Sequence, residues 1–118
     1  MKKILVIDDE KSIRNTFRIF LENAGYIPVT SPSAADAYHK IFNGDFDLII
    51  TDCIMPKTSG LELLRDLRND NILTPVIVMT GEPTSEHQAL AFEIKASAYL
   101  AKPISKETLL RTVSKIFT

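Results

Sequence analysis

Short apolar runs recur along the chain, and a helical pattern follows each of them. The predicted strands are residues 4–7, 26–30, 48–52, 75–79 and 99–100. The helical patterns cover residues 13–24, 33–44, 61–67, 85–94 and 105–116. A strand followed by a helix, repeated in units of about 25 residues, predicts a parallel sheet with helices on both faces.

The apolar runs and the length of the chain limit the possible α/β topologies further. Residues 4–7 and 48–50 are continuously apolar and mostly β-branched, which is typical of strands buried on both faces. Right-handed crossovers leave few topologies, and a chain of 118 residues is too short for an eight-stranded barrel. We therefore expect a doubly wound, five-stranded parallel sheet in the flavodoxin-like order 2-1-3-4-5.

Composition excludes several classes of protein. The length fits one domain, residues 1–118, and the net charge of −1 offers no basic surface for nucleic acid or an anionic membrane. The single cysteine, Cys53, excludes an internal disulfide and a cysteine zinc site. No apolar run has the length of a membrane span, and acidic residues follow Ile7 too early for a signal peptide. The simplest expectation is a cytoplasmic protein.

Polar side chains follow four of the five predicted strands. Asp8 and Asp9 follow the first strand, Asp52 ends the third, Thr80 follows the fourth and Lys102 the fifth. Each alone could simply cap a turn. Because parallel strands end at one edge of a sheet, and strands one and three are neighbours in the expected order, we expect the three aspartates to crowd into one pocket.

These residue types together point to phosphoryl transfer. Carboxylates that lie so close together require a counter-charge. A set of ligands that are all oxygen atoms suits Mg²⁺. Lys102 adds a charge of the kind that holds phosphate, and Thr80 adds a hydroxyl group. Asp52 could attack phosphorus and keep the group as an acyl phosphate, with catalysis coming mainly from positioning and charge neutralisation.

The same residues carry a family resemblance over essentially the whole chain. The chain resembles the response regulator receiver domain of two-component signalling systems, of the CheY-like type. The matching motifs are Asp8-Asp9, Asp52-Cys53-Ile54-Met55-Pro56-Lys57-Thr58-Ser59-Gly60, Thr80-Gly81 and Lys102-Pro103.

The resemblance implies a role for each site residue. Asp52 would accept a phosphoryl group from a histidine kinase or a histidine phosphotransfer protein. Asp9 and Asp52 would bind Mg²⁺ together with the backbone carbonyl of Cys53, with Asp8 acting mainly through water. Such a domain catalyses only its own phosphorylation and dephosphorylation, so it is not expected to be an enzyme acting on other substrates.

The resemblance also implies a switch. Thr80 and Lys102 would grip the phosphoryl oxygens, and the peptide bond between Lys102 and Pro103 would be cis. Tyr99 would turn inward when Thr80 moves, altering the face formed by the fourth helix, the fifth strand and the fifth helix. That face would control a downstream output domain or protein, with no direct contact of this domain with nucleic acid or membrane. Ile54 cannot orient a water molecule, so the phosphoryl group is predicted to hydrolyse more slowly than in relatives with a polar side chain at this position.

Other side chains are predicted to be structural. Arg14 and Arg18 are most simply a solvated helix face, although the resemblance implies that the first helix helps to dock the phosphoryl donor. Phe42 and Phe92 are predicted to lie in the core, and Ala89 on the inward face of the fourth helix.

Two alternative functions remain open on the residues alone. A Mg²⁺-dependent aspartyl-phosphate phosphatase of the haloacid dehalogenase kind also uses this chemistry, but it requires Asp-x-Asp where this chain has Asp8-Asp9. A non-phosphorylated interaction module on the same fold would lack a key residue, and none is missing. Nucleotide binding is poorly supported because the glycines form neither a P-loop nor a dinucleotide fingerprint. An end just after the fifth helix fits a single-domain regulator as well as the receiver part of a longer protein.

Overall fold

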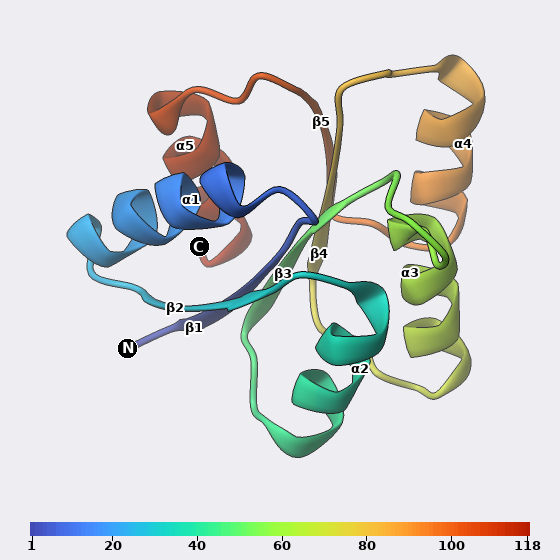
Figure 1. The fold of residues 1–118 in the computed structure, drawn as a ribbon, viewed down its shortest axis with the longest axis horizontal. Coiled ribbons are helices and arrows are strands. Elements are labelled where there is room, and N and C mark those ends of the chain that lie inside the picture. Colours follow the sequence, from blue (N-terminus) through green and yellow to red (C-terminus); the bar gives the residue numbers. More distant parts are fainter.

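The computed structural model describes residues 1–118 and alternates five strands with five helices (Figure 1). The strands are β1 (Lys3–Ile7), β2 (Ile27–Ser31), β3 (Leu48–Asp52), β4 (Val76–Thr80) and β5 (Ala98–Ala101). The helices are α1 (Lys11–Asn23), α2 (Ala34–Asn43), α3 (Gly60–Asn69), α4 (Ser85–Glu93) and α5 (Lys106–Ile116). All strand pairs are parallel, in the order β2-β1-β3-β4-β5. The predicted fold and strand order are confirmed.

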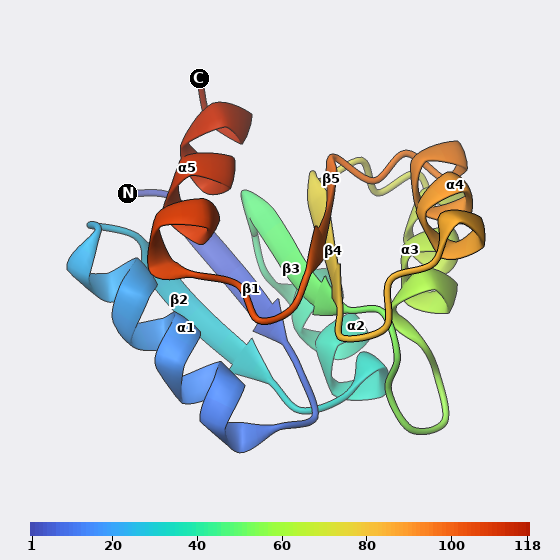
Figure 2. The same cartoon turned by 90° about the horizontal axis from the view of Figure 1, so that it is seen from above.

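The sheet separates two helical layers. Helices α1 and α5 cover one face, whereas α2, α3 and α4 cover the other (Figure 2). Side chains of β1 alternate between them: Ile4 and Val6 pack into the cluster that contains core residues of α1 and α5, and Leu5 and Ile7 pack into the opposite cluster. Because both faces are covered, the central strands are apolar along most of their length, and their buried polar residues Thr51, Asp52 and Thr80 lie at or next to the carboxyl ends. None of the five helices combines the length and apolar content that crossing a membrane requires.

Four of the five helices begin with a side-chain cap. The hydroxyl groups of Ser33, Ser59, Thr84 and Ser105 each accept a hydrogen bond from the backbone N–H three residues further on. Such caps satisfy N–H groups that have no partner inside the helix. Helix α1 is the exception, because Glu10 at its N-cap makes no such bond.

Ser33 and Asp36 have the spacing of a capping box at the start of α2, but the box is only half formed. Ser33 caps the backbone of Asp36, but the Asp36 carboxylate turns to Ser31 and Lys40 instead of the backbone of Ser33. The reciprocal capping box lies at the start of α3, between Ser59 and Glu62. Its Ser-x-x-Glu spacing was visible in the sequence.

Three predicted core positions are wrong. Ala89 is exposed, and the buried residue of α4 is Ala91. Phe42 and Phe92 are 67% and 47% exposed. Phe42 instead contacts Tyr38 one turn earlier on the surface of α2, with ring centroids 5.8 Å apart. Apolar identity alone does not distinguish a core side chain from one at the rim of a helix face.

Candidate functional site

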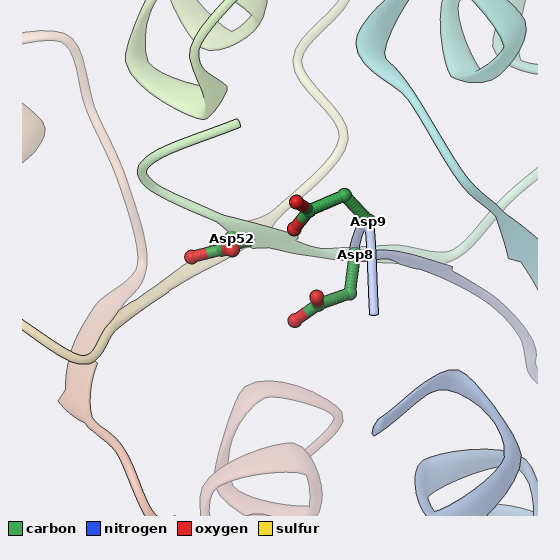
Figure 3. A group of neighbouring side chains, drawn as sticks. All are labelled: Asp8, Asp9 and Asp52. Atoms are coloured by element: carbon green, nitrogen blue, oxygen red, sulfur yellow. The ribbon is translucent and has the colours of Figure 1, made fainter. Parts of the chain in front are cut away.

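Three aspartates gather where β1 and β3 end (Figure 3). One carboxylate oxygen from each of Asp8, Asp9 and Asp52 lies within 4.8 Å of the other two. Strands β1 and β3 pair with Ile7 opposite Thr51, so the residues that follow meet at the same edge. Asp8 and Asp52 are buried and Asp9 is exposed. The structure thus brings together the three side chains that the sequence singled out as metal ligands.

Lys102 reaches into this cluster from the end of β5. Its Nζ atom lies 2.8 Å from Asp8 Oδ2 and 3.3 Å from Asp52 Oδ2. Burial lowers the pKa of Lys102, but the hydrogen bond to Asp8 and the attraction of both carboxylates outweigh it and raise the pKa above its ordinary value. The ammonium group therefore stays charged at neutral pH.

The surroundings of Asp52 disfavour the ionised form of its carboxyl group. Burial raises its pKa; the charge of Lys102 lowers it and that of Asp8 raises it again, with the pKa above the ordinary value as the result. One lysine thus does not fully compensate the cluster. All the side-chain donors are carboxylate oxygens, which hard divalent cations such as Mg²⁺ prefer. The residues present therefore fit such an ion.

Asp8 is held by four hydrogen bonds. Its N–H donates to Ser31 O at 3.1 Å, Oδ1 accepts from Glu10 N–H at 2.9 Å and Oδ2 accepts from Lys102. Its main-chain oxygen accepts from Arg14 Nη1 at 2.7 Å. The prediction that Arg14 lies on a solvated face is wrong, because the side chain folds back over the start of α1. Arg18, by contrast, is exposed and pairs with Glu22.

Gly60 lets the start of α3 pack against the end of β3. A Cβ atom at this position would lie 2.0 Å from the main-chain oxygen of Asp52 and 3.0 Å from Thr51 Oγ1. No backbone atom tolerates such an approach, so only glycine fits here. Gly60 N–H also donates to Cys53 O at 3.0 Å. That carbonyl keeps a second lone pair, and its predicted role as a metal ligand stays a prediction.

The predicted switch residues lie on β4 and β5. Thr80 is fully buried at the end of β4, where Oγ1 accepts from Glu82 N–H at 3.1 Å. Tyr99 is half-buried, and its hydroxyl oxygen accepts from Thr84 N–H at 3.4 Å. Both side chains thus contact the loop that leads into α4. The peptide bond between Lys102 and Pro103 is cis, as the resemblance implied.

Sequence reasoning missed two residues that shape the site. Gly60 was noted only as the last residue of the motif that begins at Asp52, and its spacing in the motif gave no measure of how closely α3 approaches Asp52. Arg14 lies six residues after Asp8, a spacing compatible with many surface arginines. The sequence gives no signal for its role, because Ser12 directly precedes the predicted helix as a possible cap, and only the structure shows that the N-cap is Glu10 without a capping bond.

Comparison with known proteins gives a consistent result. The family model of the response regulator receiver domain matches residues 4–114. The alkaline phosphatase synthesis transcriptional regulatory protein PhoP of Bacillus subtilis is 33% identical over 115 residues, covering 98% of this chain and 48% of PhoP. The chain spans about half the length of the curated relatives it matches.

Two solved structures show the similarity in three dimensions. Chemotaxis protein CheY4 of Vibrio cholerae superposes with a TM-score of 0.93 at 33% identity, over 98% of both chains. Response regulator TrrA of Thermotoga maritima, solved in complex with Mg²⁺-BeF, has a TM-score of 0.87 at 32% identity, over 98% of this chain and 99% of TrrA.

Proposed function

The chain belongs to the family of response regulator receiver domains, and from this premise we propose that Asp52 accepts a phosphoryl group from a phosphohistidine. The donor would be a histidine kinase or a histidine phosphotransfer protein. The observation that carries the proposal is the position of Lys102, whose Nζ atom lies between the carboxylates of Asp8 and Asp52. A cation there can contact a phosphoryl oxygen on Asp52 without leaving the site.

The transfer step uses groups that this edge brings together. A carboxylate oxygen of Asp52 attacks phosphorus and forms the O–P bond. The P–N bond to the donor imidazole breaks, its electrons stay on the ring nitrogen, and water supplies the proton. Lys102 and the hydroxyl group of Thr80 would hold the phosphoryl oxygens. Hydrolysis by water later releases inorganic phosphate and restores the carboxylate.

The proposal includes Mg²⁺. Asp9, Asp52 and the carbonyl of Cys53 would hold the ion, with Asp8 acting mainly through water. When bound, Mg²⁺ offsets the negative charge that gathers around the transferred group. The cluster of three carboxylates and the Mg²⁺-BeF complex of TrrA support this assignment.

The output would pass through the face formed by α4, β5 and α5. Thr80 moves toward the phosphoryl group and Tyr99 follows, shifting an existing equilibrium of that face. Relatives such as PhoP and CusR are transcriptional regulatory proteins about twice as long as this chain. We therefore assign residues 1–118 as one receiver domain that controls an output domain or a separate protein. Contact with nucleic acid or membrane would not pass through this domain, and a cytoplasmic location belongs to the same proposal.

The test is phosphorylation by a small donor. The protein is incubated with acetyl phosphate and Mg²⁺, and the intact mass is measured. Wild type should gain one phosphoryl group that hydroxylamine removes, whereas Asp52→Asn and wild type in EDTA should gain none. Asp45→Asn, at an exposed position, is the matched control and should gain the group normally. An undiminished adduct on Asp52→Asn would refute the proposal.

The same assay separates the alternatives. A phosphatase would release many equivalents of phosphate from small organic phosphates. A non-phosphorylated interaction module would form no adduct under any condition. The adjacent pair Asp8-Asp9, in place of Asp-x-Asp, argues against the phosphatase.

A further inference from the structure

Asp9 presents a positioning problem. Its carboxylate oxygen lies within 4.8 Å of those of Asp8 and Asp52, yet the side chain is exposed and makes no hydrogen bond or ion pair in the structure. Asp8 and Asp52, in contrast, are both bound to Lys102. Because nothing holds the Asp9 side chain itself, its direction depends on the main chain that carries it.

Both peptide groups beside Asp9 are held, each by one hydrogen bond. The carbonyl group before it, Asp8 O, accepts from Arg14 Nη1 at 2.7 Å. The N–H group after it, Glu10 N, donates to Asp8 Oδ1 at 2.9 Å. These two bonds hold the peptide planes on either side of Asp9, and those planes set the direction of its Cα–Cβ bond.

Arg14 gives the uncapped start of α1 a contact of a different kind. The other four helices begin with a Ser or Thr side chain that binds the first turn, whereas Glu10 does not cap α1. Three hydrogen bonds of Asp8, with Ser31, Glu10 and Lys102, hold the junction between β1 and α1. A guanidinium group that reaches back six residues to Asp8 O adds the only side-chain bond to the main-chain carbonyl of Asp8.

We propose that Arg14 is a positioning residue for the metal site: it fixes the main chain at Asp8 so that the Asp9 carboxylate points into the cluster. The inference rests on the proposed function, because it assigns Asp9 to a divalent cation. Groups beyond the direct ligands commonly orient a ligand in this way and affect metal affinity strongly.

The sign of the effect distinguishes positioning from simple electrostatics. Arg14 carries a positive charge beside the cluster, so its charge alone opposes a second cation. If charge were its only influence, Arg14→Met would bind Mg²⁺ more tightly. Positioning predicts weaker binding, because Asp9 loses its fixed direction.

The experiment measures Mg²⁺ affinity without any phosphoryl donor. Backbone amide shifts of ¹⁵N-labelled protein are followed during Mg²⁺ titration. Arg14→Met should weaken binding about tenfold, the lower end of the range for such outer groups. Arg18→Met, on the same helix but in the exposed pair with Glu22, is the matched control and should stay within twofold of wild type. Arg14→Lys, which keeps a donor without the rigid fork, should fall between them.

A second measurement uses the metal-free protein. The amide hydrogen of Glu10, bonded to Asp8 Oδ1, should exchange faster in Arg14→Met than in Arg18→Met. A double variant completes the test: in an Asp9→Asn background, Arg14→Met should change Mg²⁺ affinity less than twofold, because its effect passes through Asp9.

Four results would overturn the inference. Tighter Mg²⁺ binding by Arg14→Met would show that Arg14 acts on the metal site only through its charge, and unchanged binding would show that it does not act on the site. An equal tenfold loss in the Asp9→Asn background would show that Arg14 acts on another group. If Arg14→Met does not fold, Arg14→Lys decides, and wild-type affinity in that variant would count against positioning. Absence of Mg²⁺ binding by wild type would instead refute the metal assignment in the proposed function, and the inference with it.

Discussion

Two cations hold opposite ends of the sheet, and they have different partners. Lys102, where β5 ends, binds the carboxylates of Asp8 and Asp52. Arg68, at the end of α3, lies where β4 and β5 begin and donates only to main-chain carbonyls. Its acceptors are the oxygens of Ile72 at 2.8 Å, Thr74 at 3.0 Å and Lys95 at 3.0 Å. Burial lowers the pKa of Arg68, whereas the carboxylates raise that of Lys102.

The difference shows what each end of the sheet can do. The carbonyls around Arg68 belong to two loops and carry no net charge. The carboxylates around Lys102 carry charge and can be shared with an incoming cation or phosphoryl group. Charged side chains that can change partners thus lie at one edge of the sheet, and hydrogen bonds to uncharged main-chain carbonyls lie at the other.

The largest expected effect comes from removing the charge of Lys102 at the edge of the sheet that carries Asp8 and Asp52. In EDTA at neutral pH, Lys102→Met should lose about 3 kcal/mol of unfolding free energy, because buried Asp8 and Asp52 lose their paired charge. Added Mg²⁺ should stabilise this variant more than wild type, since the ion replaces the missing charge. Urea unfolding with and without Mg²⁺ measures both quantities. An equal gain from Mg²⁺ in the two proteins would contradict the exchangeable character of this edge.

The matched change at the other end should be insensitive to metal. Arg68→Met should lose about 2 kcal/mol, because the main-chain carbonyls lose a charged donor. The loss should be the same with and without Mg²⁺, and the rate of phosphorylation by acetyl phosphate should stay within twofold of wild type. A Mg²⁺-dependent loss would show that the two ends are coupled and would end the comparison.

A smaller effect is expected from the raised pKa of Asp52. Burial makes the ionised form less favourable in the folded chain than in the unfolded one, so ionised Asp52 costs stability at neutral pH. In EDTA, Asp52→Asn should therefore melt a few degrees above wild type at pH 7. The difference should shrink as the pH falls through the raised pKa toward the ordinary value of 3.8. Melting curves across this range test the sign, and a variant less stable than wild type at pH 7 would reverse it.

The smallest effect concerns the lifetime of the phosphoryl group. Ile54 is 48% exposed beside Asp52 and offers no group to orient a water molecule. Ile54→Asn should shorten the lifetime a few-fold, about 1 kcal/mol in the barrier. Leu73→Asn, an exposed apolar residue at the Arg68 end, should leave it unchanged. Decay of the adduct by intact mass gives both rates, and equal lifetimes for Ile54→Asn and wild type would disprove the prediction.

Much of the fold and the position of the site followed from local patterns. Buried parallel strands form nearly continuous apolar runs, so those at residues 4–7, 48–50 and 75–79 were recognisable without tertiary information. Connection rules then limited the strand order, and parallel strands end at one edge. Asp8, Asp52 and Lys102 could therefore be assigned to one site although they are far apart in the chain.

Only the tertiary structure decided how closely two elements approach each other and which atoms a long side chain contacts. A Cβ atom at Gly60 would lie 2.0 Å from the backbone of Asp52, a consequence of how α3 docks. Arg14 and Arg68 find their acceptors because loops place carbonyl oxygens within range of flexible side chains. Phe42, in contrast, stays exposed because nothing packs over that part of α2. Periodicity specifies which side of an element faces inward, whereas the contacts of a long side chain depend on distances between segments that no local pattern encodes.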